Sequence, residues 1–198
     1  MAPDGAQTAL PISAPGIFTA FRYCSYDVPF WARPNTREGR WNQVGDPPTQ
    51  YWSLTPDAAW SELIRAENLE TEEHLDLVRM PLWVCRVPVM NLIDLRELDQ
   101  QQAYGLDEAA QIADDWTACQ NTAPAVRNDA PGVITYSAAL DRHANFTLFG
   151  PKRAIDWRSV SALASTIPAA VAALGRPPRG IVDHVRRPLH PIPQARLF

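Results

Sequence analysis

Cysteine and lysine are scarce in this 198-residue chain, and a long hydrophobic run is absent. The three cysteines, Cys24, Cys85 and Cys119, are widely spaced and match neither a disulfide framework nor a zinc-binding pattern. We expect them to be free buried thiols in a reducing compartment. No stretch reaches the roughly 18 consecutive apolar residues of a membrane helix, and no signal-peptide pattern is visible. A cytoplasmic protein that contacts no membrane is therefore expected.

The charge balance argues against a general nucleic-acid-binding protein. Eighteen basic residues stand against 22 acidic ones, so the formal net charge is −4 at pH 7, whereas phosphate contacts need a basic surface. Lys152 is the only lysine, and this bias towards arginine does not by itself indicate a phosphate site. We expect no direct contact with nucleic acid.

Several common catalytic motifs are also missing. The chain has no Gly-x-Ser-x-Gly elbow, no Gly-x-x-x-x-Gly-Lys phosphate loop and no His-Glu-x-x-His metal helix. The four histidines are scattered along the chain, and the adjacent acids Asp114 and Asp115 would point in different directions on a helix. The sequence therefore predicts no metal site.

Hydrophobic alternation and helix signals predict an α+β fold. We expect strands at residues 17–25, 82–89, 132–139 and 145–149, with a strand-like run from Tyr51 and a strand end or turn at 91–98. Helices are expected at 56–68 and at 106–123, the second ending before Pro124. The expected organisation is a flexible lead-in at 1–15, a main domain at 16–156, and at 157–198 a C-terminal helix, within 157–174, with a tail rich in proline and arginine.

Residues 39–62 hold three side chains suited to a nucleotide. Arg40 lies in a tight loop that begins at Gly39 and can approach a ligand closely. Tyr51 and Glu62 follow on a short strand and a helix. A guanidinium for phosphate, an aromatic plane for a flat ring and a carboxylate for a developing cation are what cleavage of a nucleotide at its ribose requires. Arg40 could equally be a surface arginine in a turn.

Glu62 falls two turns into the helix that Thr55 and Pro56 are expected to start. Its neighbours at helical spacing are small and apolar: Ala58, Ala59 and Ala66. A carboxylate on such a stripe is either a buried acid with satisfied hydrogen bonds or an acid that lines a cleft. The sequence leaves both interpretations open.

Arg22 and Ser137 lie outside this block. Strand alternation places Arg22 among apolar residues, where a charge is either paired in a structural ion pair or faces a cleft. Ser137 ends an apolar strand, a position at which a hydroxyl is usually an ordinary strand residue. Tyr51 precedes Trp52, so one of the two faces the core and the other can face a pocket.

Taken together, these residues resemble the RES domain, a family named for an arginine, a glutamate and a serine and found in bacterial toxins of toxin–antitoxin pairs. The matching segments lie in order within residues 21–149: Phe21-Arg22-Tyr23, Gly39-Arg40-Trp41-Asn42 with Gly45, Tyr51, Ala59 with Glu62, Asp115-Trp116 with Cys119-Gln120, and Gly132-Val133-Ile134 leading to Ser137-Ala138. Tyr136 departs from the family, in which proline often precedes the serine, and the segment after about residue 157 lies outside the resemblance.

The resemblance implies an ADP-ribosyltransferase-like fold, with a split, twisted β core, flanking helices and a central NAD cleft. It implies a catalytic set of Arg40, Glu62, Ser137 and Tyr51. The implied NAD contacts are Arg22, Tyr23, Arg40, Trp41, Asn42, Tyr51, Glu62 and Ser137. NAD would be a consumed substrate, cleaved by a glycohydrolase or phosphorylase that needs no cofactor and no metal.

In the implied mechanism, Arg40 and Arg22 hold the pyrophosphate and Tyr51 stacks on nicotinamide or ribose. Glu62 stabilises an oxocarbenium-like transition state, and Ser137 orients Glu62 or the nicotinamide amide. Two alternatives are an ADP-ribosyltransferase that modifies a specific protein and a non-catalytic module that binds NAD or ADP-ribose.

The resemblance also implies a cognate antitoxin that blocks the site. Candidate contact surfaces are the acidic residues 70–76 and the basic residues 176–196, although both are also typical of solvated segments. A homodimer is a further arrangement that the sequence leaves open.

Overall fold

The computed structural model describes residues 16–24, 29–30, 33–78, 80–89, 91–151 and 158–162. The expected lead-in at 1–15 and all of the expected C-terminal segment except 158–162 lie outside these residues. The described strands are β1 (Gly16–Tyr23), β2 (Thr49–Ser53), β3 (Leu82–Val89), β4 (Ile93–Asp94), β5 (Gly132–Tyr136), β6 (Ala144–Phe149) and β7 (Arg158–Ala162). The helices are α1 (Pro56–Ala66), α2 (Glu72–Leu77), α3 (Leu98–Tyr104), α4 (Glu108–Ile112) and α5 (Thr117–Asp129).

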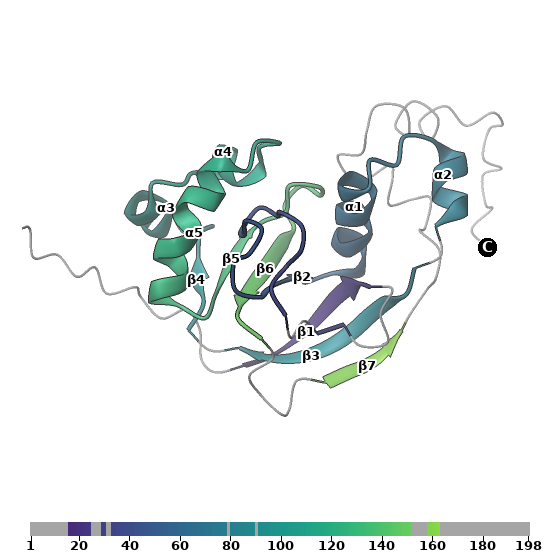
Figure 1. Cartoon of the computed structure of the whole chain (residues 1–198), viewed down its shortest axis with the longest axis horizontal. Helices are drawn as coiled ribbons and strands as arrows, with labels where there is room; N and C mark the ends of the chain where they lie inside the picture. The colour runs from purple at the N-terminus through teal and green to yellow at the C-terminus, as the bar shows by residue number, and fades with distance from the viewer. Residues whose placement is uncertain are drawn as a thin grey trace, which may run out of the picture.

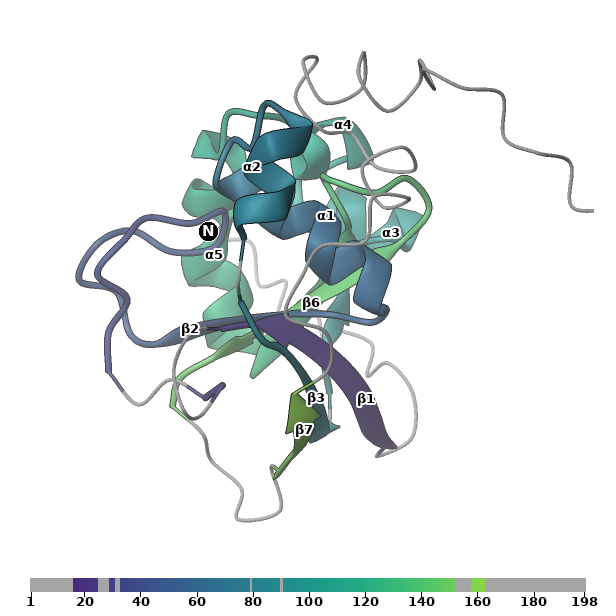
Figure 2. The same ribbon diagram turned by 90° about the vertical axis from the view of Figure 1, so that its right-hand side faces the viewer.

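These strands form one twisted sheet in the order β4-β5-β6-β2-β1-β3-β7, and the α+β class is as expected. Among the described strand pairs, β4–β5 is parallel and the others are antiparallel. Figure 1 shows α3, α4 and α5 at the β4 end of the sheet and α1 and α2 at the other end. The perpendicular view shows the helices gathered on one side of β1 and β2 (Figure 2).

The sheet is split between β1 and β2. β1 pairs with β3 along its whole length, and β2 likewise pairs with β6. By contrast, β1 and β2 meet in register at one pair, Phe21 opposite Ser53. Two half-sheets, β4-β5-β6-β2 and β1-β3-β7, therefore diverge from this junction. This confirms the split, twisted β core with flanking helices.

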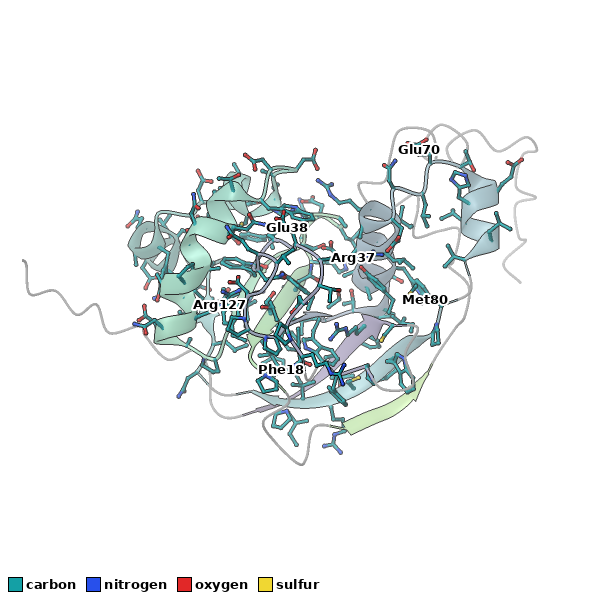
Figure 3. The ribbon with its side chains drawn as sticks, viewed as in Figure 1. Phe18, Arg37, Glu38, Glu70, Met80 and Arg127 are labelled. Carbon is teal, nitrogen blue, oxygen red and sulfur yellow. The ribbon has the colours of Figure 1, made fainter. Side chains whose placement is uncertain are left out.

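The two faces of the sheet carry different hydrophobic clusters. Helix α1 packs on β1 through a cluster of Ala59, Trp60, Leu63, Ile64, Leu75 and Leu82, against which Phe21 and Tyr23 also pack. Helix α5 packs on β5 and β6 through a cluster that includes Cys119, Ala123, Val126, Val133 and Phe149. The other face carries a cluster without helical residues: Ala20, Trp52, Cys85, Val87, Leu92, Ile134, Ala144, Phe146 and Leu148. In Figure 3, Phe18, which packs on this last cluster, lies on the sheet below the helices.

Helix α1 begins as its sequence predicts. The Thr55 hydroxyl accepts a hydrogen bond from the Ala58 N–H at 3.2 Å, and Pro56 follows at the first helical position. The helix ends at Ala66, two residues before the expected end, and Ala66 is exposed rather than part of the buried stripe.

The helix expected at 106–123 is wrong in two respects. Residues 108–112 and 117–129 form separate helices, and Trp116 is the N-cap residue of α5 instead of an interior position. Helix α5 also continues through Pro124. Proline removes one hydrogen bond from a helix, but Cys119, Ala123 and Val126 form a buried face here, and the burial of that face offsets the loss.

The C-terminal helix expected within residues 157–174 stays a prediction. Residues 158–162, inside the expected helical range of 157–174, form strand β7 and pair with β3. The rest of that range lies outside the described residues.

We predict that Gly132→Ala destabilises the sheet. A Cβ atom at this position in β5 would collide with the Thr147 carbonyl oxygen on β6, so the paired strands must shift. Such overpacking costs about 1–3 kcal/mol, and a chain of this size loses about 2–4 °C of Tm per kcal/mol. Thermal unfolding followed by circular dichroism measures the change.

The matched control is Gly105→Asn. Gly105 ends α3 with φ +63°, and a Cβ atom added there would meet nothing within 4 Å; asparagine tolerates this left-handed conformation. Its Tm should stay close to that of the wild type. A Gly132→Ala variant as stable as the control would contradict the β5–β6 register.

Candidate active site

The carboxylate of Glu62 joins three segments of the chain. One oxygen, Oε1, accepts a hydrogen bond from the Ser137 hydroxyl at 2.7 Å and another from the Asn145 amide nitrogen at 2.6 Å. Glu62 lies on α1, Ser137 follows β5 directly, and Asn145 lies on β6. The structure thus brings together Glu62 and Ser137, which are 75 residues apart in the sequence.

The direction of the Ser137 hydroxyl is set by its backbone neighbours. Its oxygen accepts hydrogen bonds from the N–H groups of Ala139 and Leu140 at 3.2 and 3.1 Å. A hydroxyl has two acceptor sites and one proton, so the proton points to Glu62. This arrangement orients the carboxylate and provides no base that would activate Ser137 as a nucleophile.

A third contact fixes α1 to the turn after β5. The Arg65 guanidinium donates from Nη1 to the Ala138 carbonyl at 3.0 Å and also pairs with Asp114. Arg65 lies one turn beyond Glu62, so the helix is held to this turn at two adjacent residues, Ser137 and Ala138. No local sequence pattern singled out Arg65.

Asn145 and Ser53 were also missed by the sequence analysis. The Ser53 hydroxyl donates to Asn145 Oδ1 at 2.8 Å, and the two residues lie opposite each other in the β2–β6 register. In sequence, Asn145 was only the start of an expected strand. The register that places it beside Ser53 and Glu62 was the missing information.

Tyr23 and Arg22 point to opposite faces of β1. Tyr23 packs in the α1 cluster, where burial and then the negative charge of Glu62 raise the pKa of its hydroxyl well above the ordinary value. Arg22 is buried with its guanidinium 5.4 Å from the centre of the Trp52 ring, and it donates from Nη1 to the Pro29 carbonyl at 3.1 Å. Burial lowers the pKa of Arg22 to about 10, so the side chain stays charged at pH 7. Its role as a phosphate contact stays a prediction.

Tyr51 holds the loop that carries Arg40. The Tyr51 hydroxyl accepts from the Trp41 N–H at 2.9 Å and donates to Asn42 Oδ1 at 2.7 Å. A Cβ atom at Gly39 would lie 2.6 Å from the Tyr51 oxygen, so only glycine permits this close approach. Trp52 lies in the core of the other face, which confirms that the two aromatic residues point in opposite directions.

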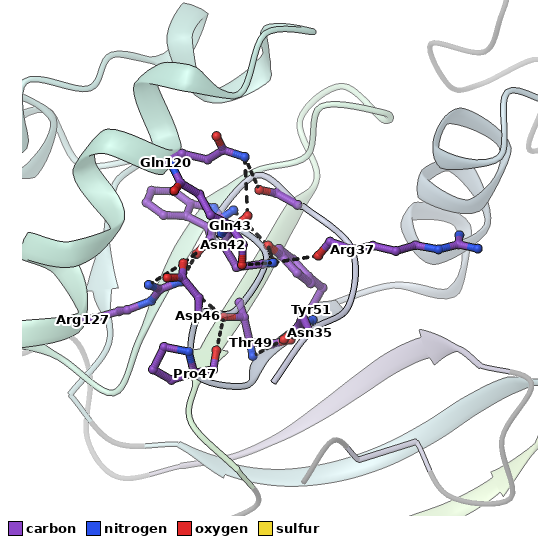
Figure 4. Close-up of polar contacts among 12 residues, drawn as sticks. Asn35, Arg37, Asn42, Gln43, Asp46, Pro47, Thr49, Tyr51, Gln120 and Arg127 are labelled. Carbon is purple, nitrogen blue, oxygen red and sulfur yellow. Dashed lines mark hydrogen bonds and ion pairs between the residues drawn. The ribbon is translucent and has the colours of Figure 1, made fainter. Parts of the chain in front are cut away.

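Helix α5 anchors the same loop from the other side (Figure 4). Gln120 donates to the Gly39 carbonyl at 3.0 Å. Arg127 pairs with Asp46 at 2.9 Å, donates to the Trp41 carbonyl, and lies 5.1 Å from the centre of the Phe149 ring. The loop is therefore a rigid platform, although it has no regular secondary structure beyond the Gly39–Asn42 bridge.

Arg40 has a spare donor. Its Nη1 atom is buried and has no hydrogen-bond partner in the described part of the chain. Burial raises the pKa values of Cys119 and Tyr51 overall. The charge of the guanidinium acts to lower both, and for Cys119 a hydrogen bond from the Arg40 side chain acts in the same direction. An unpaired buried donor is costly, and an anionic group of a ligand would satisfy it.

The two groups of residues lie on one face of the sheet. Tyr51 and Ser53 are two positions apart on β2 and therefore point to the same side, with their α-carbons about 7 Å apart. The Tyr51 hydroxyl is hydrogen-bonded to the Arg40 loop. The Ser53 hydroxyl is hydrogen-bonded to Asn145, which in turn donates to Glu62. This face thus offers a guanidinium, phenol rings and a carboxylate between α1 and α5. The sequence-predicted residues Trp41 and Asn42 belong to the loop, and only Arg22 points to the other face.

No group of three or more histidine, cysteine or acidic residues suited to a metal ion occurs among the described residues. Within the same residues, no helix has the length and apolar character needed to cross a membrane.

We predict that the Asp46–Arg127 contact makes loop stability pH-dependent. Burial acts to raise the pKa of Asp46, but hydrogen bonds from the Gln43 N–H and from Arg127 outweigh it and hold this pKa below its usual value of 3.8. The stabilisation is present above the unfolded pKa and is lost as the pH falls through the folded one. Asp46→Asn should therefore lower the free energy of unfolding at pH 7, and this deficit should shrink as the pH falls below the ordinary aspartate pKa.

Urea unfolding of both proteins from pH 7 to pH 2.5 measures this difference. Glu38→Gln, which removes an exposed carboxylate from the same loop (Figure 3), is the control and should match the wild type at pH 7. A deficit of Asp46→Asn that persists unchanged at pH 2.5 would contradict the assignment.

Comparisons with known proteins identify the family and support the fold. The model of the RES domain family matches residues 14–168. The chain is 28% identical over 172 residues to a Mycobacterium tuberculosis protein named probable NAD(+) phosphorylase Rv3189, covering 83% of this chain and 80% of the relative. Its fold is similar to that in the crystal structure of the M. tuberculosis MbcT–MbcA toxin–antitoxin complex, with a TM-score of 0.65 and 22% identity over 81% of this chain and 90% of that one. The ADP-ribosyltransferase-like fold is as the resemblance implied, and the chain belongs to the RES domain family.

Proposed function

We propose that this protein is an enzyme that cleaves the bond between nicotinamide and ribose in NAD. The observation that carries the proposal is the Glu62 carboxylate, held through one oxygen by Ser137 and Asn145 on the face that also carries Tyr51 and Arg40. Membership of the RES domain family and similarity to a protein named as a probable NAD(+) phosphorylase support NAD as the substrate.

Glu62 stabilises the positive charge that develops on the ribose. As the glycosidic bond breaks, its electron pair goes to the nicotinamide nitrogen, so the cationic ring leaves neutral and the ribose becomes oxocarbenium-like. A carboxylate fixed beside the ribose hydroxyls favours this transition state over the ground state. Ser137 acts by orienting the carboxylate, because its proton is already committed to Glu62.

Arg40 holds the pyrophosphate, and Tyr51 is the aromatic partner. The buried Nη1 donor of Arg40 supports this role, since a phosphate oxygen would give it a charge-assisted hydrogen bond. Both hydrogen bonds of the Tyr51 hydroxyl are made within the loop, so any contact with the nicotinamide or ribose comes from its ring. Trp41 and Asn42 shape the loop, and Tyr23 borders Glu62.

The acceptor is a small molecule. With phosphate, NAD yields nicotinamide and ADP-ribose 1″-phosphate; with water it yields nicotinamide, ADP-ribose and a proton. The name of the M. tuberculosis relative favours phosphate. A protein acceptor would instead make the chain an ADP-ribosyltransferase, and a labelled protein product would reveal it.

We predict that Glu62→Gln sharply lowers the rate of nicotinamide release with little loss of fold. Glutamine keeps the size of the side chain and an acceptor for Ser137 but removes the charge. Loss of one preorganised electrostatic group costs about 10²–10³ in kcat.

Arg40→Ala should mainly raise KM for NAD, by about 10–100-fold, as expected for a lost charged hydrogen bond. Chromatographic assay of nicotinamide measures both.

Arg37→Ala is the matched control for Arg40→Ala. Arg37 lies on the same loop, but its exposed side chain extends away from the loop contacts (Figure 4). Among the described residues, its hydrogen bond to the loop is made by its backbone carbonyl. It should keep wild-type kcat and KM. Full activity in both Glu62→Gln and Arg40→Ala would show that the site is assigned wrongly.

We further propose that the chain is a toxin held in check by a cognate antitoxin protein. The toxin–antitoxin complex of similar fold supports this, and NAD loss would harm any cell that makes the enzyme unprotected. Of the candidate contact surfaces, Glu70 and Glu73 are exposed, and Glu70 lies at the α2 end of the molecule (Figure 3). The basic residues 176–196 lie outside the described chain.

Expression in a heterologous bacterium should therefore deplete NAD and stop growth. Glu62→Gln at equal protein level should do neither, and the native host, which would carry the antitoxin, should tolerate the wild type. The measurements are growth curves and NAD content of cell extracts. Equal inhibition of growth by the wild type and Glu62→Gln would rule out toxicity through NAD cleavage.

A further inference from the structure

Asn145 lies between Ser53 and Glu62. Its Oδ1 accepts from the Ser53 hydroxyl at 2.8 Å, and its Nδ2 donates to Glu62 Oε1 at 2.6 Å. An asparagine amide can be turned either way, and its hydrogen-bond network decides the orientation. Here the partners agree: a carboxylate oxygen can only accept, so Nδ2 faces Glu62 and Oδ1 faces the hydroxyl of the buried Ser53.

Both donors bind the same oxygen of Glu62. Ser137 and Asn145 meet at Oε1 from two neighbouring segments, one from the turn after β5 and one from β6. Oε2 accepts no hydrogen bond from any described residue. The terminal torsion of a glutamate has a broad preference, so two donors on one oxygen are what select a single orientation of the carboxylate.

We propose that Asn145 is a positioning residue for Glu62. Asn145 and Ser137 bind Oε1 of the carboxylate, and Oε2 then faces the ribose hydroxyls of the substrate. This inference rests on the proposed function. Ser53 contributes to the same positioning, because its hydroxyl donates to Asn145 Oδ1 and so keeps the amide nitrogen directed at Glu62. The strand pair β2–β6 therefore sets the direction of the catalytic carboxylate on α1.

The consequence is a specific kinetic signature. Without the Asn145 donor, Glu62 keeps its charge and one hydrogen bond but rotates more freely, so it meets the transition state in the right orientation less often. A misplacement on the order of 1 Å can cost about 10²-fold in rate. Substrate binding through the Arg40 loop is untouched. Asn145→Ala should thus lower kcat by about 10²-fold and leave KM for NAD nearly unchanged.

A second variant distinguishes orientation from simple loss of structure. Asn145→Asp keeps the shape but places a second carboxyl group against Glu62, and the pKa of one of two such groups is raised. When that group is protonated, the pair shares a proton and the missing donor is restored. The ratio of kcat for Asn145→Asp to that of the wild type should therefore rise as the pH falls from 8 to 5. Ser53→Ala should show a smaller loss of kcat.

The experiment measures nicotinamide release by the full chain between pH 5 and 8, with Tm measured for each variant. Asn128→Ala, at an exposed position of α5, is the control and should behave as the wild type. A loss of kcat at constant KM, with recovery of Asn145→Asp at acid pH, supports the proposal. Full activity of Asn145→Ala, or a loss in Asn145→Asp that does not change with pH, overturns it and leaves NAD cleavage standing. A wild type that releases no nicotinamide overturns NAD cleavage and this proposal together.

Discussion

Two hydrogen bonds to a single carboxylate oxygen are the contact on which the candidate site depends. They tie α1 to the turn after β5 and to β6, although the three segments are far apart in sequence. The contact also bridges the split of the sheet. β1 and β2 meet at one residue pair, and α1, which packs on β1, is held to the β5–β6 side by Glu62 and Arg65. The same contact thus stabilises the packing of α1 and orients the Glu62 carboxylate that the proposed chemistry uses.

The loop that carries Arg40 is held in place by a separate set of hydrogen bonds. The loop at residues 37–46 is held by hydrogen bonds with Tyr51 on β2 and with Gln120 and Arg127 on α5. This anchoring leaves one donor of Arg40 unsatisfied within the described chain. A rigid loop with a spare cationic donor suits an anionic ligand, because the cost of ordering is already met when the ligand binds. The two sets of hydrogen bonds meet on β2, where Tyr51 and Ser53 face the same side.

Local signals predicted much of this arrangement. Thr55 and Pro56 started α1 as expected, and the alternation of Tyr51 and Trp52 separated their faces correctly. The partnership of Glu62 with Ser137 came from the family resemblance rather than from any local pattern. Asn145 was missed because its role depends on strand register, and a one-residue slip would have turned its side chain to the other face. The expectation that a helix ends before Pro124 was wrong, because burial of the α5 face outweighs one lost hydrogen bond. That balance depends on packing against the sheet, which the local sequence does not show.

The central claim is that this face of the sheet cleaves NAD, and the identity of the product tests it most directly. Purified protein should be incubated with NAD in buffers with and without phosphate, and the products identified by mass spectrometry. Our account predicts release of nicotinamide together with ADP-ribose 1″-phosphate when phosphate is present. Recovery of intact NAD in both buffers, from protein that binds NAD, would contradict it and indicate a module that recognises the dinucleotide without cleaving it.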